Sequence, residues 1–172
     1  MNLLAISLAE AVKLKSILTK KIQELLNEMN TVSHVIVEKG EEPKQPEHSL
    51  QKIETELADI RKDSRTLDAL IYRANIDNSV TFKGETLAIV EAIELATQLR
   101  AEAAHCKQLG QSEKESFFHS SGETILYRVA MFEPSEYRKR ANELEKEAHR
   151  LSNAINAVNY QIQLDFDDMK YF

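Results

Sequence analysis

Residues 50–74, LQKIETELADIRKDSRTLDALIYRA, carry a seam of apolar or small residues spaced alternately three and four apart. The seam consists of Leu50, Ile53, Leu57, Ile60, Ser64, Leu67, Ile71 and Ala74. This alternation places all eight side chains on one side of an α-helix. The stretch therefore predicts a helix from about residue 47 to 74. At about 1.5 Å per residue it spans about 40 Å, a length typical of a bundle or a coiled-coil hairpin.

Three further helices are predicted, over about residues 7–32, over 86–110 and from Pro134 onward. Ser7 followed by Glu10 is a capping-box signature. Gly110 lies where a left-handed glycine commonly ends a helix. The last helix carries a heptad-like seam, Tyr137, Ala141, Leu144, Ala148, Leu151, Ile155, Val158 and Ile162. Because the helix from Pro134 and the one over 47–74 have the strictest seams, we expect them to form one antiparallel coiled-coil pair.

A small β element is expected at about residues 34–38 and 124–132, where β-branched and aromatic residues gather. The second segment pairs either with the first or with the stretch around Phe117. Residues 80–82 read as extended, and alternation through 162–166 predicts a final strand. The predicted fold class is mostly α, with four long helices in a bundle or coiled-coil hairpin arrangement, forming a single helical domain over residues 1–172.

Composition limits the classes of function. Of the 172 residues, 42% are hydrophobic and 29% charged, which excludes a disordered tail. A net charge of −6 argues against a nucleic-acid partner, because binding to phosphates usually needs a basic face. The single cysteine, Cys106, excludes an intramolecular disulfide. We expect a cytoplasmic protein without a membrane partner, since the chain shows no signal peptide and no apolar run of about 18–20 residues.

Several segments, taken in order, resemble the septicolysin-like family of small bacterial proteins, whose function is largely unknown. The resemblance rests on residues 8–11, 38–43, 71–75 with Asn78, 84–87, the strand-like run before the last helix, and 155–160. Two features depart from the pattern of that family. Tyr160 stands where its members tend to have tryptophan, and the helix over 86–110 is rich in alanine.

The name of that family implies a thiol-activated cytolysin, but the residues argue against such an activity. A secreted pore-former needs an export signal and a membrane-inserting surface, often with tryptophan. This chain has no tryptophan. Cys106 lies on an apolar stripe with Ala103, where a buried thiol is usually inert.

The sharpest candidate for metal chemistry is Glu102-x-x-His105, because residues three apart share one helix face and this spacing occurs in di-metal bundles. Glu145 and His149, four apart on the last helix, are the other candidate ligands. The alternative is that all four are solvated side chains.

The leading interpretation is a structural or interaction protein that self-assembles through its helical seams as a homo-oligomer. Four long helices with wide stripes carry more apolar surface than one four-helix core hides. We expect no catalytic residues and no cofactor. A metal-dependent enzyme with ligands inside the bundle is the first alternative, and a cytolysin-like membrane activity, implied only by the family resemblance, is the second.

Overall fold

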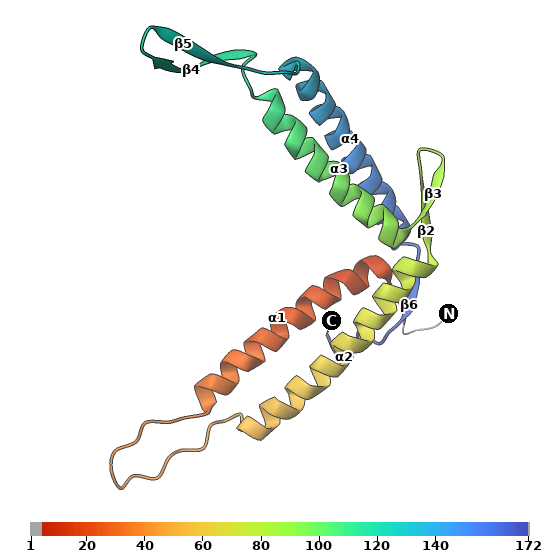
Figure 1. Cartoon of the computed structure of the whole chain (residues 1–172). Coiled ribbons are helices and arrows are strands. Elements are labelled where there is room, and N and C mark those ends of the chain that lie inside the picture. Colours follow the sequence, from red (N-terminus) through yellow and green to blue (C-terminus); the bar gives the residue numbers. More distant parts are fainter. Residues whose placement is uncertain (1–4, 172) are drawn as a thin grey trace. The chain divides into compact units, whose positions relative to one another are not determined.

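The structure, a computed structural model, describes residues 5–171 apart from the side chain of Ser121 (Figure 1). This part of the chain contains four α-helices and three two-stranded antiparallel sheets, which confirms a mostly helical fold with small β elements. The chain divides into two units. The first combines residues up to Asp77 with those from Asn159 onward, and the second is Asn78–Val158. The expectation of one domain over residues 1–172 stays a prediction.

The first unit is a pair of helices joined to a short sheet. Its elements are β1 (Ala5–Ser7), α1 (Leu8–Val32), α2 (Leu50–Asp77) and β6 (Gln163–Asp165). Helices α1 and α2 run side by side as a hairpin (Figure 1). Strand β1 pairs with β6, with Ile6 opposite Leu164, and the Leu8 N–H donates to the carbonyl of Ile162 at 2.9 Å. The predicted final strand is thereby confirmed over 163–165.

The capping box predicted at the start of α1 is confirmed. The Glu10 N–H donates to Ser7 Oγ at 3.2 Å, and the Ser7 N–H donates to Glu10 Oε2 at 2.8 Å. This backbone donor, helped by the Ser7 hydroxyl, lowers the pKa of Glu10. The box satisfies two backbone donors that a helix start otherwise leaves free, and so it fixes where strand β1 ends and α1 begins.

The seam of α2 is buried, but its partner differs from the one expected. Ile53, Leu57, Ile60, Leu67, Ile71 and Ala74 are buried, as are Leu8, Ala11, Leu14, Leu18 and Leu25 of α1. Helix α2 thus packs on its neighbour in sequence, and the expected pairing of residues 47–74 with the helix from Pro134 was wrong. Periodicity identifies which face of a helix is buried, but a heptad seam alone does not identify the helix that covers it.

The strand predicted over residues 34–38 is also wrong. These residues lie in the connection between α1 and α2, outside any helix or strand. Val35 and Val37 are exposed, and Ile36 is fully so. A β-branched run becomes a strand only when another strand takes up its backbone hydrogen bonds, and none pairs with this segment in the described residues.

The second unit contains two helices and two β-hairpins. Its elements are β2 (Ser79–Phe82), β3 (Glu85–Ala88), α3 (Ile89–Gly110), β4 (Glu115–Ser121), β5 (Thr124–Val129) and α4 (Pro134–Asn159). Lys83 and Gly84 both have positive φ (51° and 82°) and form the two-residue turn between β2 and β3. Helix α3 therefore starts at Ile89 rather than near residue 86. The strand predicted over 124–132 is confirmed for 124–129, and its partner is the segment around Phe117.

Small residues lie between α3 and α4. Those buried include Ala92, Ala96 and Ala103 of α3 and Ala141 and Ala148 of α4. Arg100 donates from its guanidinium to the Ser152 hydroxyl across the pair. Small side chains allow two helix backbones to approach closely.

Gly110 ends α3 for a reason that differs from the one predicted. It lacks the positive φ of a left-handed cap, which the structure shows at Gly40, Gly84 and Gly122. A Cβ atom at Gly110 would lie 2.6 Å from Cγ and 3.0 Å from the backbone nitrogen of Arg138. The Arg138 guanidinium also donates to the Gly110 carbonyl at 2.7 Å. Close approach of the end of α3 to the start of α4 therefore requires glycine here.

Candidate functional site

The carboxylates predicted as metal ligands face basic side chains of the neighbouring helix. Glu102 of α3 pairs with the guanidinium of Arg140 of α4. Glu145 of α4 lies 3.8 Å from Nζ of Lys107 of α3. Both carboxylates belong to cross-helix ion pairs on the surface, where such pairs typically contribute less than about 1 kcal/mol.

The two histidines predicted with them, His105 and His149, are exposed. Between residues 5 and 171, no three or more histidine, cysteine, aspartate or glutamate side chains are grouped so that they could hold a metal ion. The ion pairs of Glu102 and Glu145 account for the positions of those carboxylates. The metal-binding interpretation stays a prediction that depends on rearrangement of these pairs.

A hollow of about 500 Å³ lies in the first unit, between α1, α2 and the residues near the C-terminus. Its apolar wall comes from Ile17 and Ile60, and its polar lining consists of Lys21, Glu56, Asp59, Asp63, Lys170 and Tyr171. Within this lining, Lys21 Nζ lies 3.7 Å from Glu56 Oε1. Lys170 likewise pairs with Asp63. Four of the five charged groups in the lining of the hollow are therefore paired with one another.

Asp63 is the centre of the contacts that hold the C-terminal residues on α2. The Tyr171 hydroxyl donates to Asp63 Oδ2 at 2.6 Å, and Lys170 Nζ lies 3.2 Å from the same oxygen. The Tyr171 hydroxyl, and less strongly the Lys170 ammonium, lower the pKa of Asp63. Burial, together with the Asp63 carboxylate, raises the pKa of Tyr171. The arrangement acts as a latch that fastens the chain after β6 to α2.

Changing Tyr171 to Phe is expected to lower the free energy of unfolding by about 1 kcal/mol near pH 7, the usual value of one hydrogen bond. The lowered pKa of Asp63 gives stability that is present above its ordinary pKa of about 3.9 and lost as the pH falls through the folded value. The raised pKa of Tyr171 gives stability that is lost as the pH rises past about 10. The difference between wild type and Tyr171→Phe should therefore be largest between roughly pH 5 and 9.

Urea unfolding followed by circular dichroism across this pH range measures the effect. Tyr160→Phe is the matched control, because Tyr160 is exposed and surface changes usually stay within about 0.5 kcal/mol. Equal losses for the two variants would show that the latch does not stabilise the fold. A larger loss for Tyr171→Phe that does not change with pH would show that the contribution of Tyr171 does not depend on the Asp63 carboxylate.

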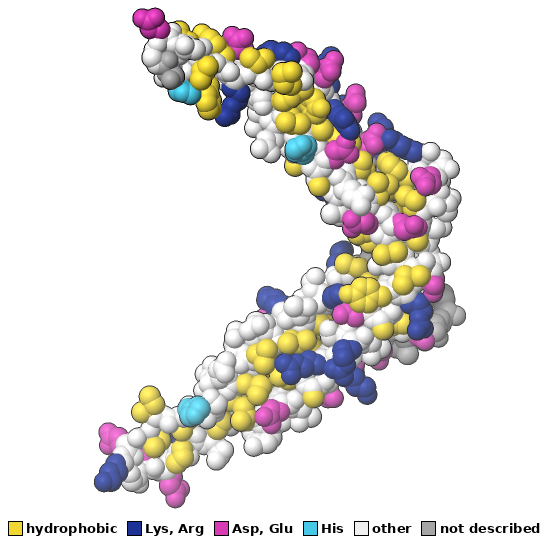
Figure 2. Space-filling view, in the orientation of Figure 1, with side chains coloured by type: hydrophobic (Ala, Val, Ile, Leu, Met, Phe, Trp, Pro, Cys, Tyr) yellow, Lys and Arg dark blue, Asp and Glu magenta, His cyan; other side chains and the backbone are white. Residues whose placement is uncertain are grey.

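Hydrophobic side chains lie at the surface of the helix pairs of both units (Figure 2). In the first unit Val12, Ile17 and Tyr72 are 46%, 41% and 61% exposed. In the second, Val90 and Ile93 of α3 are 48% and 43% exposed. Within each unit a helix has one helical neighbour, so one seam is covered and the flanks of each wide stripe face solvent.

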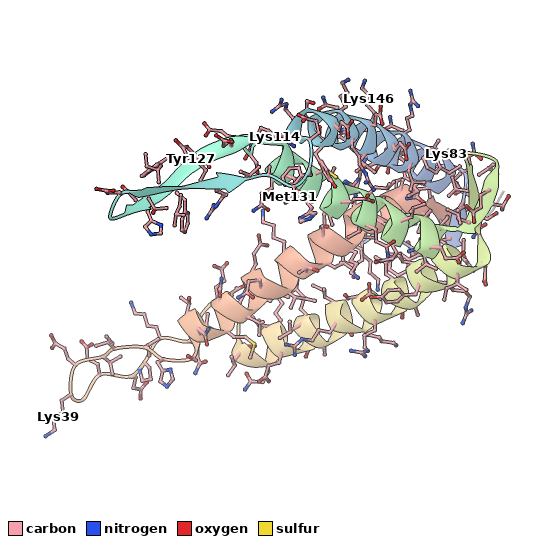
Figure 3. All side chains as sticks on the ribbon, turned by 45° about the horizontal axis from the view of Figure 1, so that its top comes forward. Lys39, Lys83, Lys114, Tyr127, Met131 and Lys146 are labelled. Atoms are coloured by element: carbon pink, nitrogen blue, oxygen red, sulfur yellow. The ribbon has the colours of Figure 1, made fainter. Side chains whose placement is uncertain are left out.

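The β4–β5 hairpin projects beyond α3 and α4 (Figure 1), and every residue of β5 is exposed. Successive strand residues point to opposite faces, and paired residues share a face. The register pairs Phe117 with Tyr127 and Glu115 with Val129, which puts Phe117, Ile125, Tyr127 and Val129 on one face. We call these four residues the hairpin stripe. Figure 3 shows Tyr127 on the hairpin, and Lys114 and Met131 where it meets the helices.

The opposite face of the hairpin is more polar. A register shift lies between Phe117 and His119. The Arg128 guanidinium lies 5.5 Å from the ring centre of Phe118, and the rings of Phe118 and His119 meet edge to face at 5.0 Å. The hairpin is therefore amphipathic, and its apolar side is the hairpin stripe.

Sequence reasoning missed the latch but contained a signal for the hairpin stripe. Asp63 and Tyr171 are 108 residues apart, and no spacing rule links a helical aspartate to a distant tyrosine. The alternation of Ile125, Tyr127 and Val129 is visible in the sequence, but only the partner strand shows that Phe117 joins the same face.

Comparison with known proteins gives one family and one fold. The family model described as "Family of unknown function (DUF6847)" matches residues 15–164. A crystal structure described as that of a functionally unknown conserved protein from Corynebacterium diphtheriae superposes with a TM-score of 0.71 and 23% sequence identity. The match covers 93% of this chain and 99% of that one, and it shows a shared fold. No curated protein matches the chain.

These matches correct the resemblance to septicolysin-like proteins. The family that matches most of the chain is a different one, and the similar solved structure carries no such description. The cytolysin-like activity depended on that resemblance alone and is withdrawn with it. In the part of the chain that the structure describes, no helix is long and apolar enough to cross a membrane.

Proposed function

Since the chain belongs to a family of unknown function (DUF6847), we propose its role from its surface: it is a structural or interaction protein that assembles with copies of itself. The observation that carries this proposal is the apolar surface left on the helix pairs. In a bundle each helix buries a stripe against two neighbours. Here each helix has one helical neighbour within its unit, and side chains such as Val12 and Val90 are about half exposed.

The bundle or coiled-coil arrangement predicted from the seams would then arise between chains. A helix pair from one copy supplies the second neighbour that a helix pair of another copy lacks. Obligate interfaces of this kind bury about 2,000 Å² or more and are more apolar than the rest of the surface. The net charge of −6 makes copies repel one another, so contact is favoured where the surface is uncharged.

We also propose a cytoplasmic location. It is supported by Cys106, the single thiol of the chain, which lies on α3 three residues after the buried Ala103 and is 2% exposed. A lone buried thiol is suited to a reducing compartment. Fractionation of cells that produce the native chain tests this location, and recovery outside the cytoplasm would contradict it.

Sedimentation velocity of the purified protein tests self-assembly. At micromolar concentration we expect a mass that is a multiple of 19.6 kDa. The double variant Val12→Glu/Val90→Glu places charges on the exposed apolar surface and should shift the protein toward monomer. We expect this shift because assembly would bury the new carboxylates without a partner, which costs several kcal/mol.

The control adds the same two charges at exposed polar positions of the same helices, as Asn30→Glu/Gln108→Glu. This control should sediment like the wild type. A wild-type protein that remains monomeric at micromolar concentration would overturn the proposal. A control that dissociates as readily as the test variant would show that added charge alone, rather than these surfaces, decides assembly.

A further inference from the structure

We propose that the hairpin stripe is a contact between two copies of this chain, with two β4–β5 hairpins packed face to face about a twofold axis. This inference rests on the self-assembly proposed above and names one of its surfaces. The stripe consists of Phe117, Ile125, Tyr127 and Val129, which are 62%, 57%, 55% and 50% exposed.

The hairpin needs a covering partner because a two-stranded hairpin alone is at best marginally stable in water. At its base the two connecting segments are joined to each other by the Ala130 N–H, which donates to the Lys114 carbonyl at 2.9 Å, and by Lys114 Nζ, which donates to the Phe132 carbonyl at 2.8 Å. Beyond these contacts the six residues of β5 are all exposed. Packing of a second layer on the stripe would give the hairpin the apolar core that it lacks.

Charge favours a second copy as the partner. Three cross-strand pairs lie on the face that carries the stripe. From the base of the hairpin to its tip they are Glu115 with Val129, Phe117 with Tyr127, and Ser120 with Ile125. When two hairpins pack face to face with their strands running in opposite directions, the Phe117–Tyr127 pairs of the two copies meet at the centre. Val129 then meets the partner's Ile125. Glu115 then faces the partner's Ser120 rather than a second carboxylate. The stripe thus matches itself without opposing like charges, as an isologous contact requires.

The area of the stripe sets how much this contact can contribute. Fully burying an aromatic side chain covers about 150–250 Å². With about half of each side chain exposed, the four residues offer roughly 400 Å² per copy, against about 800 Å² per partner in a standard interface. The hairpin contact supplies about half of a stable dimer, and the helix surfaces supply the remainder.

Disulfide trapping tests the contact directly, because Cys106 is buried and leaves no exposed native thiol. Tyr127→Cys lies at the centre of the stripe, next to the twofold axis. We expect it to form a covalent dimer under mild oxidation with copper phenanthroline. The control is Leu126→Cys, the adjacent residue on the opposite face, which is 39% exposed. It should remain uncrosslinked. Mixing Ile125→Cys with Val129→Cys should give more dimer than either variant alone.

A second readout does not depend on oxidation. Phe117→Ser/Tyr127→Ser should raise the dissociation constant of the assembly at least tenfold in sedimentation, with unchanged helical circular dichroism. If the wild type is an oligomer but Tyr127→Cys crosslinks no better than Leu126→Cys, the hairpin contact is overturned and self-assembly through the helices stands. An unchanged dissociation constant for the serine variant has the same meaning. A monomeric wild type overturns both proposals.

Discussion

Replacing Leu67 by alanine is expected to lower the free energy of unfolding of the first unit by about 3 kcal/mol. Leu67 lies in the middle of the α2 seam and is 0% exposed. Its removal loses the transfer free energy of the side chain and leaves a cavity between α1 and α2 that neighbouring leucines fill only in part. Urea unfolding at fixed protein concentration measures the change, since assembly would otherwise alter the midpoint.

Leu70→Ala is the matched control for this prediction. Leu70 lies three residues further along the same helix, is half-buried, and lines a shallow surface groove. The loss there should stay near or below about 1 kcal/mol, because less apolar area is uncovered. If both substitutions have equal effects, the α2 seam is not the core of the first unit.

Changing Gly110 to alanine is expected to destabilise the second unit by about 2 kcal/mol, within the range seen for overpacked contacts. The added methyl group would meet Arg138 Cγ at 2.6 Å and the Arg138 backbone nitrogen at 3.0 Å. The side-chain atom can move away, but the backbone contact forces α3 and α4 apart where they meet. In a free helix the same change would raise the stability of the helix by roughly 1 kcal/mol. The sign of the measured change in unfolding free energy therefore shows whether the contact between α3 and α4 or the helix propensity of alanine dominates at this position.

Thermal unfolding of Gly110→Ala, beside the exposed control Gln108→Ala, measures this effect. The double variant Gly110→Ala/Arg138→Ala should recover only part of the loss, because the backbone contact persists. A stabilised Gly110→Ala protein would mean that the ends of α3 and α4 are further apart than the structure shows.

The helices could be predicted from the sequence because each carries its own periodicity. The seam of α2 and the capping box of Ser7 and Glu10 depend on residues close in sequence, and both are confirmed. Which helix packs on each seam depends on residues distant in sequence. The prediction that residues 47–74 pair with the last helix was wrong for this reason. Local pattern also misplaced a strand at 34–38, since strand formation needs a partner that local sequence does not supply.

The candidate sites divide in the same way. Glu102 and Glu145 drew attention through spacing on their own helices, but spacing could not reveal that Arg140 and Lys107 of the facing helices pair with them. The link between Asp63 and Tyr171 joins distant parts of the chain and has no local signature. Gly110 shows that a residue can be located correctly and explained wrongly, because a cap and a close helix contact both favour glycine.

The β1–β6 sheet has a consequence for the order in which the protein is made. Strand β1 emerges from the ribosome more than 150 residues before its partner β6. All of residues 78–158 are synthesised in between, so the second unit can complete its contacts while the first still lacks a strand and the latch on Asp63. The sheet and the latch of the first unit therefore close only after the whole of the second unit has been synthesised.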